Sequence, residues 1–156
     1  KRIPFIGNFM IGGILGLVFL FTEGAIYGKM DKMWMPFFLA TLLSTIRELA
    51  KDGADLAGDS TVNLKTFPRK FGLISTLWLL RLMTTALCFF AITPYTGGCY
   101  GIIYLITLIL GVEIPLLYSM FIFLSEKSGP TDYVKASKIL KGVTMAGMLV
   151  ILSSGF

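Results

Sequence analysis

Five long apolar runs constrain this chain more than any other feature of its sequence. A helix needs about 20 apolar residues to cross a hydrocarbon core of about 30 Å. Runs of this kind cover residues 4–22, 33–50, 71–92, 100–124 and 136–156. The run 33–50 has the shortest apolar part and leads directly into charged residues. The sequence therefore predicts an all-α, polytopic membrane bundle with five transmembrane helices.

The composition agrees with a single membrane domain over residues 1–156. Hydrophobic residues make up 55% of the chain and charged residues 15%, whereas soluble domains carry about 25% charged residues. The mean hydropathy is +0.79. The chain contains no histidine, which excludes histidine-based triads, haem ligation by histidine and histidine-containing zinc sites within it.

Lysine and arginine are distributed unevenly between the two sides of the predicted bundle. If the runs alternate in direction, eleven of the fourteen basic residues lie on the side of the N-terminus, Lys29 and Lys32 lie on the other side, and Arg81 lies within a run. Basic residues are retained on the cytoplasmic side. We therefore expect the N-terminal side to be cytoplasmic and the loop 93–99 to face outward. The net charge of +5 then reflects topology and contact with anionic membrane lipids, and it gives no indication of nucleic-acid binding.

Three aspartates lie next to the second apolar run, on the side predicted to be cytoplasmic. Asp52, Asp55 and Asp59 are spaced by three and four residues, so a helix would project them from one face. Carboxylates that close repel one another unless a cation lies between them. A cluster of oxygen ligands suits Mg2+, which commonly also binds phosphate oxygens. The spacing therefore predicts a magnesium site that bridges to a diphosphate.

The charged segment also resembles a known family motif. Its residues are Arg47-Glu48, Lys51-Asp52, Asp55 and Gly58-Asp59, followed by Leu64-Lys65-Thr66-Phe67-Pro68 and Gly72. This order resembles the second aspartate-rich segment of the UbiA-type intramembrane prenyltransferases. Two more segments resemble the openings of the family's fifth and ninth helices: Lys1-Arg2-Ile3-Pro4 with Gly7-Asn8, and Ala136-Ser137-Lys138-Ile139-Leu140-Lys141. The resemblance implies that the chain is the C-terminal half of a nine-helix fold, with the first aspartate-rich motif and four helices absent from it.

The resemblance implies a reaction and roles for individual residues. Members of the family transfer an isoprenyl group from its diphosphate to an acceptor, with Mg2+ held by the acidic motifs. Asp55 and Asp59 occupy the paired positions of the second motif, and Asp52 is the flanking outer ligand. Lys51 is expected to act with the two aspartates in catalysis. Diphosphate contacts are expected from Arg47, Lys51 and Lys65.

The acceptor and the host assembly stay open at this stage. The form Arg-Glu-x-x-Lys-Asp-x-x-Asp is most similar to family members that attach a geranylgeranyl chain to geranylgeranylglyceryl phosphate, while related members prenylate aromatic quinone precursors or esterify chlorophyllide. We expect catalysis only from a complete protein, with this chain inactive alone. The alternatives are a non-catalytic half-length subunit that scaffolds a larger membrane complex, and a small transporter.

Charged and small residues inside the runs give further expectations. Arg81 lies ten residues into the run 71–92, and Glu113 lies eleven residues before the end of the run 100–124. Their depths match at roughly 15 Å, so we expect a structural ion pair within the membrane. Pro115 is expected to bend its helix. The small-residue pairs, Gly12 with Gly16 and Gly24 with Gly28, predict close helix packing.

Overall fold

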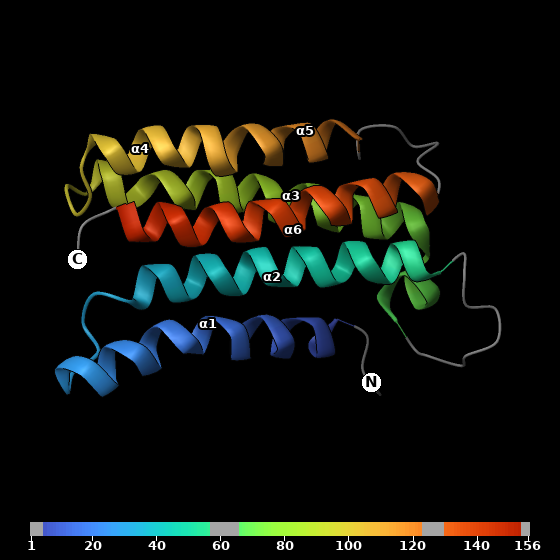
Figure 1. Cartoon of the computed structure of the whole chain (residues 1–156). Helices are drawn as coiled ribbons and strands as arrows, with labels where there is room; N and C mark the ends of the chain where they lie inside the picture. The colour runs from blue at the N-terminus through green and yellow to red at the C-terminus, as the bar shows by residue number, and fades with distance from the viewer. Residues whose placement is uncertain (1–4, 57–65, 123–129, 154–156) are drawn as a thin grey trace.

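The structure is a computed structural model that describes residues 5–56, 66–122 and 130–153. Every regular element in these residues is helical. The elements are α1 (Ile6–Tyr27), α2 (Trp34–Asp55), α3 (Phe67–Thr96), α4 (Ile102–Leu108), the π-helical turn η1 (Ile109–Glu113), α5 (Ile114–Ile122) and α6 (Pro130–Ser153). Because α4, η1 and α5 run on without a break, the described residues form five long rods that lie side by side (Figure 1). The predicted all-α bundle is confirmed.

Four of the five rods are long and apolar enough to cross a membrane. They are α1, α3, the continuous helix from Ile102 to Ile122, and α6. The remaining rod, α2, has a comparable length of 22 residues but carries charged residues in its second half. The chain is therefore a multi-pass membrane protein, and α2 is the helix whose composition differs from that of a simple span.

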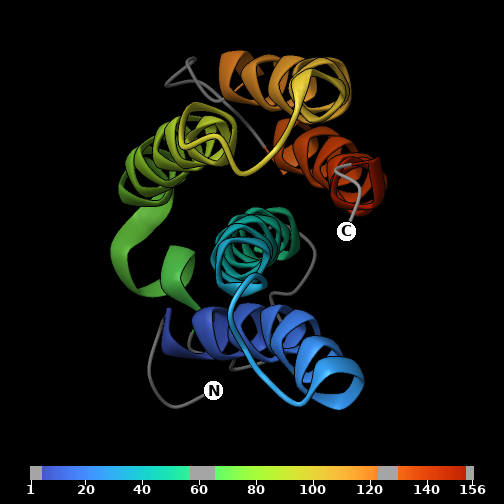
Figure 2. The same ribbon diagram turned by 90° about the vertical axis from the view of Figure 1, so that its left-hand side faces the viewer.

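Helix α2 lies inside the bundle. It packs against α1, α3 and α6, and Figure 2 shows it between α1 on one side and α3 and α6 on the other. Ile46, Leu49 and Ala50 are fully buried, as are Leu80 of α3 and Leu140 of α6. The charged end of α2 is therefore held by neighbours on several sides.

Two glycines of α1 allow α1 and α2 to pack closely. A Cβ added at Gly12 would lie 2.5 Å from the carbonyl oxygen of Thr41, and one at Gly16 would lie 2.7 Å from the carbonyl oxygen of Phe37. Real Cβ atoms do not approach backbone oxygens this closely, so both positions require glycine. The packing predicted for this pair is confirmed. Gly28 has a different function, because it ends α1 with φ +67° and its N–H donates to the Gly24 carbonyl.

Two helices depart from regular geometry at points that shape the bundle. In α3, Gly72 has φ 84° and ψ 164°, so the helix is broken after its first turn and continues in a new direction. In the fourth rod, the π-helical turn η1 ends immediately before Ile114 and Pro115. The Ile114 N–H donates to the Ile109 carbonyl. Proline has no N–H to donate and its ring crowds the preceding turn, and a widened turn is one way for a helix to accommodate it.

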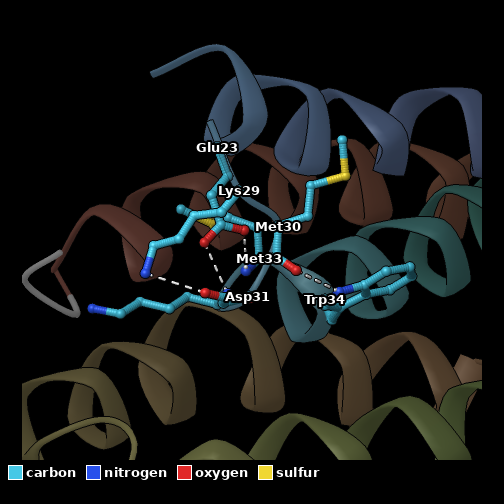
Figure 3. A network of polar contacts seen from close by, with 7 residues as sticks. Glu23, Lys29, Met30, Asp31, Met33 and Trp34 are labelled. Carbon is cyan, nitrogen blue, oxygen red and sulfur yellow. Dashed lines mark hydrogen bonds and ion pairs between the residues drawn. The ribbon is translucent and has the colours of Figure 1, made fainter. Parts of the chain in front are cut away.

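A buried carboxylate fixes the turn between α1 and α2. Glu23 is 3% exposed, and its two oxygens accept hydrogen bonds from the backbone N–H groups of Lys32 at 2.8 Å and Met33 at 3.0 Å (Figure 3). Lys29 and Asp31 form an ion pair at 3.2 Å in the same turn. Carboxylates at a helix N-terminus satisfy N–H groups that have no partner within the helix. Glu23 therefore anchors the start of α2 to α1.

Candidate active site at the charged end of α2

The acidic residues lie at the end of α2 where three other helices begin. Asp52 and Asp55 are in its last turn, and the first turns of α1, α3 and α6 lie at the same end of the bundle (Figure 1). No basic residue lies in that last turn. The C-terminal end of a helix carries partial negative charge, so carboxylates there are unfavourable unless a cation compensates them. This placement agrees with a site for a metal ion.

The side chains of this charged end differ in exposure. Asp52 is 8% exposed, whereas Asp55 and Lys51 are exposed and Arg47 is half-buried. Arg47 and Lys51 are separated by one helical turn and therefore lie on the same face. Asp59 and Lys65, the other residues predicted for the site, lie outside the described residues. Asp55 is the described carboxylate that α2 presents outward.

Asp52 is held by α1. The Asn8 side-chain amide donates a hydrogen bond to Asp52 Oδ2 at 2.9 Å. Asn8 is 1% exposed, so both partners of this bond are buried. An unsatisfied buried carboxylate would be strongly destabilising, and an amide donor offsets part of that penalty. The first turn of α1 and the last turn of α2 are thus joined at the acidic segment.

Tyr133 of α6 holds the same turn from another direction. Its ring lies against Gly53, where an added Cβ would lie 2.5 Å from Tyr133 Cε1. Tyr133 is fully buried, and its hydroxyl donates to the carbonyl of Leu73 at 3.3 Å. Leu73 directly follows the break at Gly72. Residues of α1, α3 and α6 therefore fix the backbone around Asp52.

These contacts bear on whether a metal ion fits the site. Carboxylate oxygens are the ligands that Mg2+ prefers, and a carboxylate has more lone pairs than the hydrogen bond from Asn8 occupies. Within residues 5–56, 66–122 and 130–153, no three acidic or cysteine side chains gather closely enough to hold a metal. The predicted third ligand, Asp59, lies outside those ranges. Asp52 and Asp55 supply carboxylate oxygens of the kind that Mg2+ binds, and the three-aspartate site stays a prediction.

The ion pair expected between Arg81 and Glu113 is not found among the described residues. The ion pairs there are Lys29 with Asp31 and Lys135 with Asp132. The Glu113 carboxyl lies against the Cys88 side chain, and its Oε1 has no hydrogen-bond partner in the described part of the chain. The Arg81 guanidinium lies 4.9 Å from the ring centroid of Trp78.

Helix register explains this difference. Cys88, the α3 residue beside Glu113, lies seven residues beyond Arg81. At 1.5 Å per residue this separation is about 10 Å along the helix. The depths estimated from the ends of the apolar runs are misleading because α3 begins at Phe67 and breaks at Gly72. The prediction of an Arg81–Glu113 ion pair is therefore wrong for the described structure.

Sequence reasoning missed the contacts that hold the acidic turn. Asn8 is part of the family-like opening of the chain, but nothing local connects it to Asp52, which lies 44 residues away. Gly53 gave a weak signal, because a glycine inside a helix that also carries function is often a point of close approach. Tyr133 gave none, since the residues around it in the sequence form no motif.

A bundle of membrane-crossing helices with an acidic turn at one end defines a multi-pass membrane protein. The sequence matches the UbiA prenyltransferase family over residues 1–139. The chain therefore belongs to the UbiA prenyltransferase family. The family expected from the motif residues is confirmed.

Individual relatives narrow the comparison. The chain is 33% identical over 154 residues to a digeranylgeranylglyceryl phosphate synthase of Methanopyrus kandleri, covering 99% of this chain and 55% of the relative. It is 35% identical over 154 residues to the protein of that name from Methanocaldococcus jannaschii, covering 98% and 52% respectively. A structure solved in a study of digeranylgeranylglyceryl phosphate synthase in membranes aligns with a TM-score of 0.83 and 30% identity, over 96% of this chain and 52% of that one. The chain thus spans about half the length of these relatives.

Proposed function

We propose that the chain contributes the second aspartate-rich motif of a Mg2+-dependent prenyltransferase, which transfers an isoprenyl group from its diphosphate to an acceptor in the membrane. The observation that carries this proposal is the acidic last turn of α2, where Asp52 and Asp55 lie at the negative end of a helix with no basic residue in that turn. Membership of the UbiA family supplies the class of reaction. The proposed metal ligands are Asp52, Asp55 and Asp59.

Each residue of the site has a proposed role. When bound, Mg2+ would neutralise charge that develops on the leaving diphosphate. Asp55 presents its carboxylate outward to the ion, and Asp52 supports it from a buried position. Lys51 and Arg47, one helical turn apart, are placed to contact phosphate oxygens, to which both side chains are suited. Lys65 is proposed to contact the same diphosphate.

We propose geranylgeranyl diphosphate as the donor and geranylgeranylglyceryl phosphate as the acceptor. This choice is supported by the relatives, which are named for the product digeranylgeranylglyceryl phosphate. Because the chain covers about half of those relatives, the activity belongs to a complete protein, and the chain alone is expected to be inactive.

A chimera tests the proposed function. In it, this chain replaces the matching half of the Methanocaldococcus jannaschii relative, to which it is 35% identical. The chimera should transfer a labelled geranylgeranyl group to geranylgeranylglyceryl phosphate, and EDTA should abolish the transfer. A folded but inactive chimera would favour a non-catalytic membrane subunit instead.

The acidic end of α2 is proposed to face the cytoplasm. Lys138 of α6 lies at that end and is exposed, whereas the native Cys99 is exposed at the opposite end. In intact cells, a membrane-impermeant maleimide should label Cys99. In a double variant, Cys99→Ser with Lys138→Cys, the maleimide should label the new cysteine only after the membrane is permeabilised. Labelling with the opposite pattern would contradict the proposed topology.

A further inference from the structure

We infer that Asn8 is a positioning residue for the proposed metal site, because its hydrogen bond to Asp52 fixes the acidic turn of α2. The inference rests on the proposed function. It assigns a role in metal binding to a residue of α1 that lies far from the acidic motif in sequence. Asn8 is not proposed to contact the metal or the substrate.

The first argument is the burial of the hydrogen bond. Asn8 is 1% exposed and Asp52 8% exposed, and the amide nitrogen lies 2.9 Å from Asp52 Oδ2. A hydrogen bond inside a protein is electrostatically stronger than the same bond in water. It therefore restricts the rotamer of Asp52, and with it the direction of the second carboxylate oxygen.

The second argument is the rigidity of the surroundings. Gly12 and Gly16 bring the backbones of α1 and α2 into contact over the next two turns, so Asn8 cannot shift easily relative to Asp52. On the other side, Tyr133 lies against Gly53. The Asn8 amide is thus presented to the acidic turn from a fixed framework, as expected of a group that orients a metal ligand.

The third argument is the difference between the two described carboxylates. Asp55, three residues further along α2, is exposed, whereas Asp52 is buried against α1. A mobile exposed carboxylate loses side-chain entropy when it binds a metal. Asp52 loses less side-chain entropy than Asp55 when the metal binds, because the hydrogen bond from Asn8 already fixes its conformation. Loss of the Asn8 amide should therefore weaken metal binding without removing a ligand.

The test compares variants of the chimera described above. The first readout is the Mg2+ concentration at which prenyl transfer reaches half its maximal rate. The second is the Mg2+ concentration that gives half of the maximal rise in unfolding temperature, measured in the presence of inorganic diphosphate. For Asn8→Leu, we expect both concentrations to rise by about 10-fold or more, the usual effect of losing a group that orients a ligand. The transfer rate at saturating Mg2+ should change far less.

Two control variants separate positioning from simple stabilisation. Thr45→Val alters another fully buried polar residue at the contact of α2 with α1, and it should leave the Mg2+ response unchanged. The exchange Asn8→Asp with Asp52→Asn restores an amide–carboxylate hydrogen bond but places the charge on α1. It should recover the unfolding temperature lost in Asn8→Leu, but its Mg2+ response should stay weak because the Asp52 carboxylate, a proposed ligand, is no longer present.

The outcomes are distinguishable. If Asn8→Leu lowers the unfolding temperature but leaves both Mg2+ concentrations unchanged, the bond is merely structural and the inference is wrong. Recovery of the Mg2+ response in the exchange variant would show that Asp52 is not a ligand, and the inference would then be wrong as well. If the unsubstituted chimera shows no Mg2+ response at all, the proposed function fails and the inference fails with it.

Discussion

Replacing Asp55 with asparagine in the chimera is expected to reduce prenyl transfer on the order of 100-fold or more, while the protein remains folded. The substitution keeps the side-chain shape but removes an anionic oxygen ligand, and charge stabilisation of the leaving diphosphate depends on the metal. Because Asp55 is exposed, the unfolding temperature should hardly change. The rate of transfer from labelled geranylgeranyl diphosphate measures the effect.

Asp31→Asn is the matched control for this substitution. Asp31 is also an exposed aspartate, with 63% of its side chain accessible, but it lies in the turn at the opposite end of α2. Its substitution should leave transfer unchanged. We would abandon metal binding by this motif if Mg2+-dependent turnover survived in both Asp55→Asn and Asp59→Asn.

Adding a methyl group at Gly12 or Gly16 is expected to destabilise the bundle by about 1–3 kcal/mol at each position, as overpacking does in other tightly packed interiors. The new Cβ would collide with a backbone carbonyl oxygen of α2 in each case. Backbone atoms cannot move aside as a flexible side chain can. Gly12→Ala and Gly16→Ala should therefore lower the free energy of unfolding, measured by denaturant titration in detergent micelles.

Gly13→Ala provides the control, because a Cβ at Gly13 would meet no atom within 4 Å. Alanine favours helix over glycine by roughly 0.5–1 kcal/mol. Gly13→Ala should thus be neutral or stabilising. Equal losses at Gly12, Gly13 and Gly16 would show that close packing of α1 on α2 is not the reason for the glycines.

The helices were predictable from the apolar runs, but their ends were not. The first run was expected to end at Thr22, yet α1 continues to Tyr27 because the Glu23 carboxylate is satisfied by backbone N–H groups of the following turn. The third run was expected to begin at Phe71, yet α3 begins at Phe67. Pro68 in its first turn explains the earlier start, since proline is well suited to the first positions of a helix.

The candidate site was only partly predictable because its framework is made of long-range contacts. Binding of Mg2+ and diphosphate could be predicted from the charged residues of a single helix, because their spacing places them near one another. These residues are Arg47, Lys51, Asp52 and Asp55. The partner of Asp52 comes from a different helix, and no local pattern specifies that packing. The prediction of an Arg81–Glu113 ion pair was wrong for a similar reason. The register between the two helices depends on where α3 begins and on the irregular turns at Gly72 and η1, which the apolar runs do not show.

Binding of diphosphate to the chimera tests the central claim most directly, namely that the acidic end of α2 holds Mg2+ and diphosphate together. Isothermal titration calorimetry should show that inorganic diphosphate binds in the presence of MgCl2. The affinity for diphosphate should fall by about 10-fold or more in EDTA. It should fall by a similar factor in Asp55→Asn with MgCl2 present. Equal affinities for diphosphate with MgCl2, with EDTA and in the Asp55→Asn variant would contradict the claim.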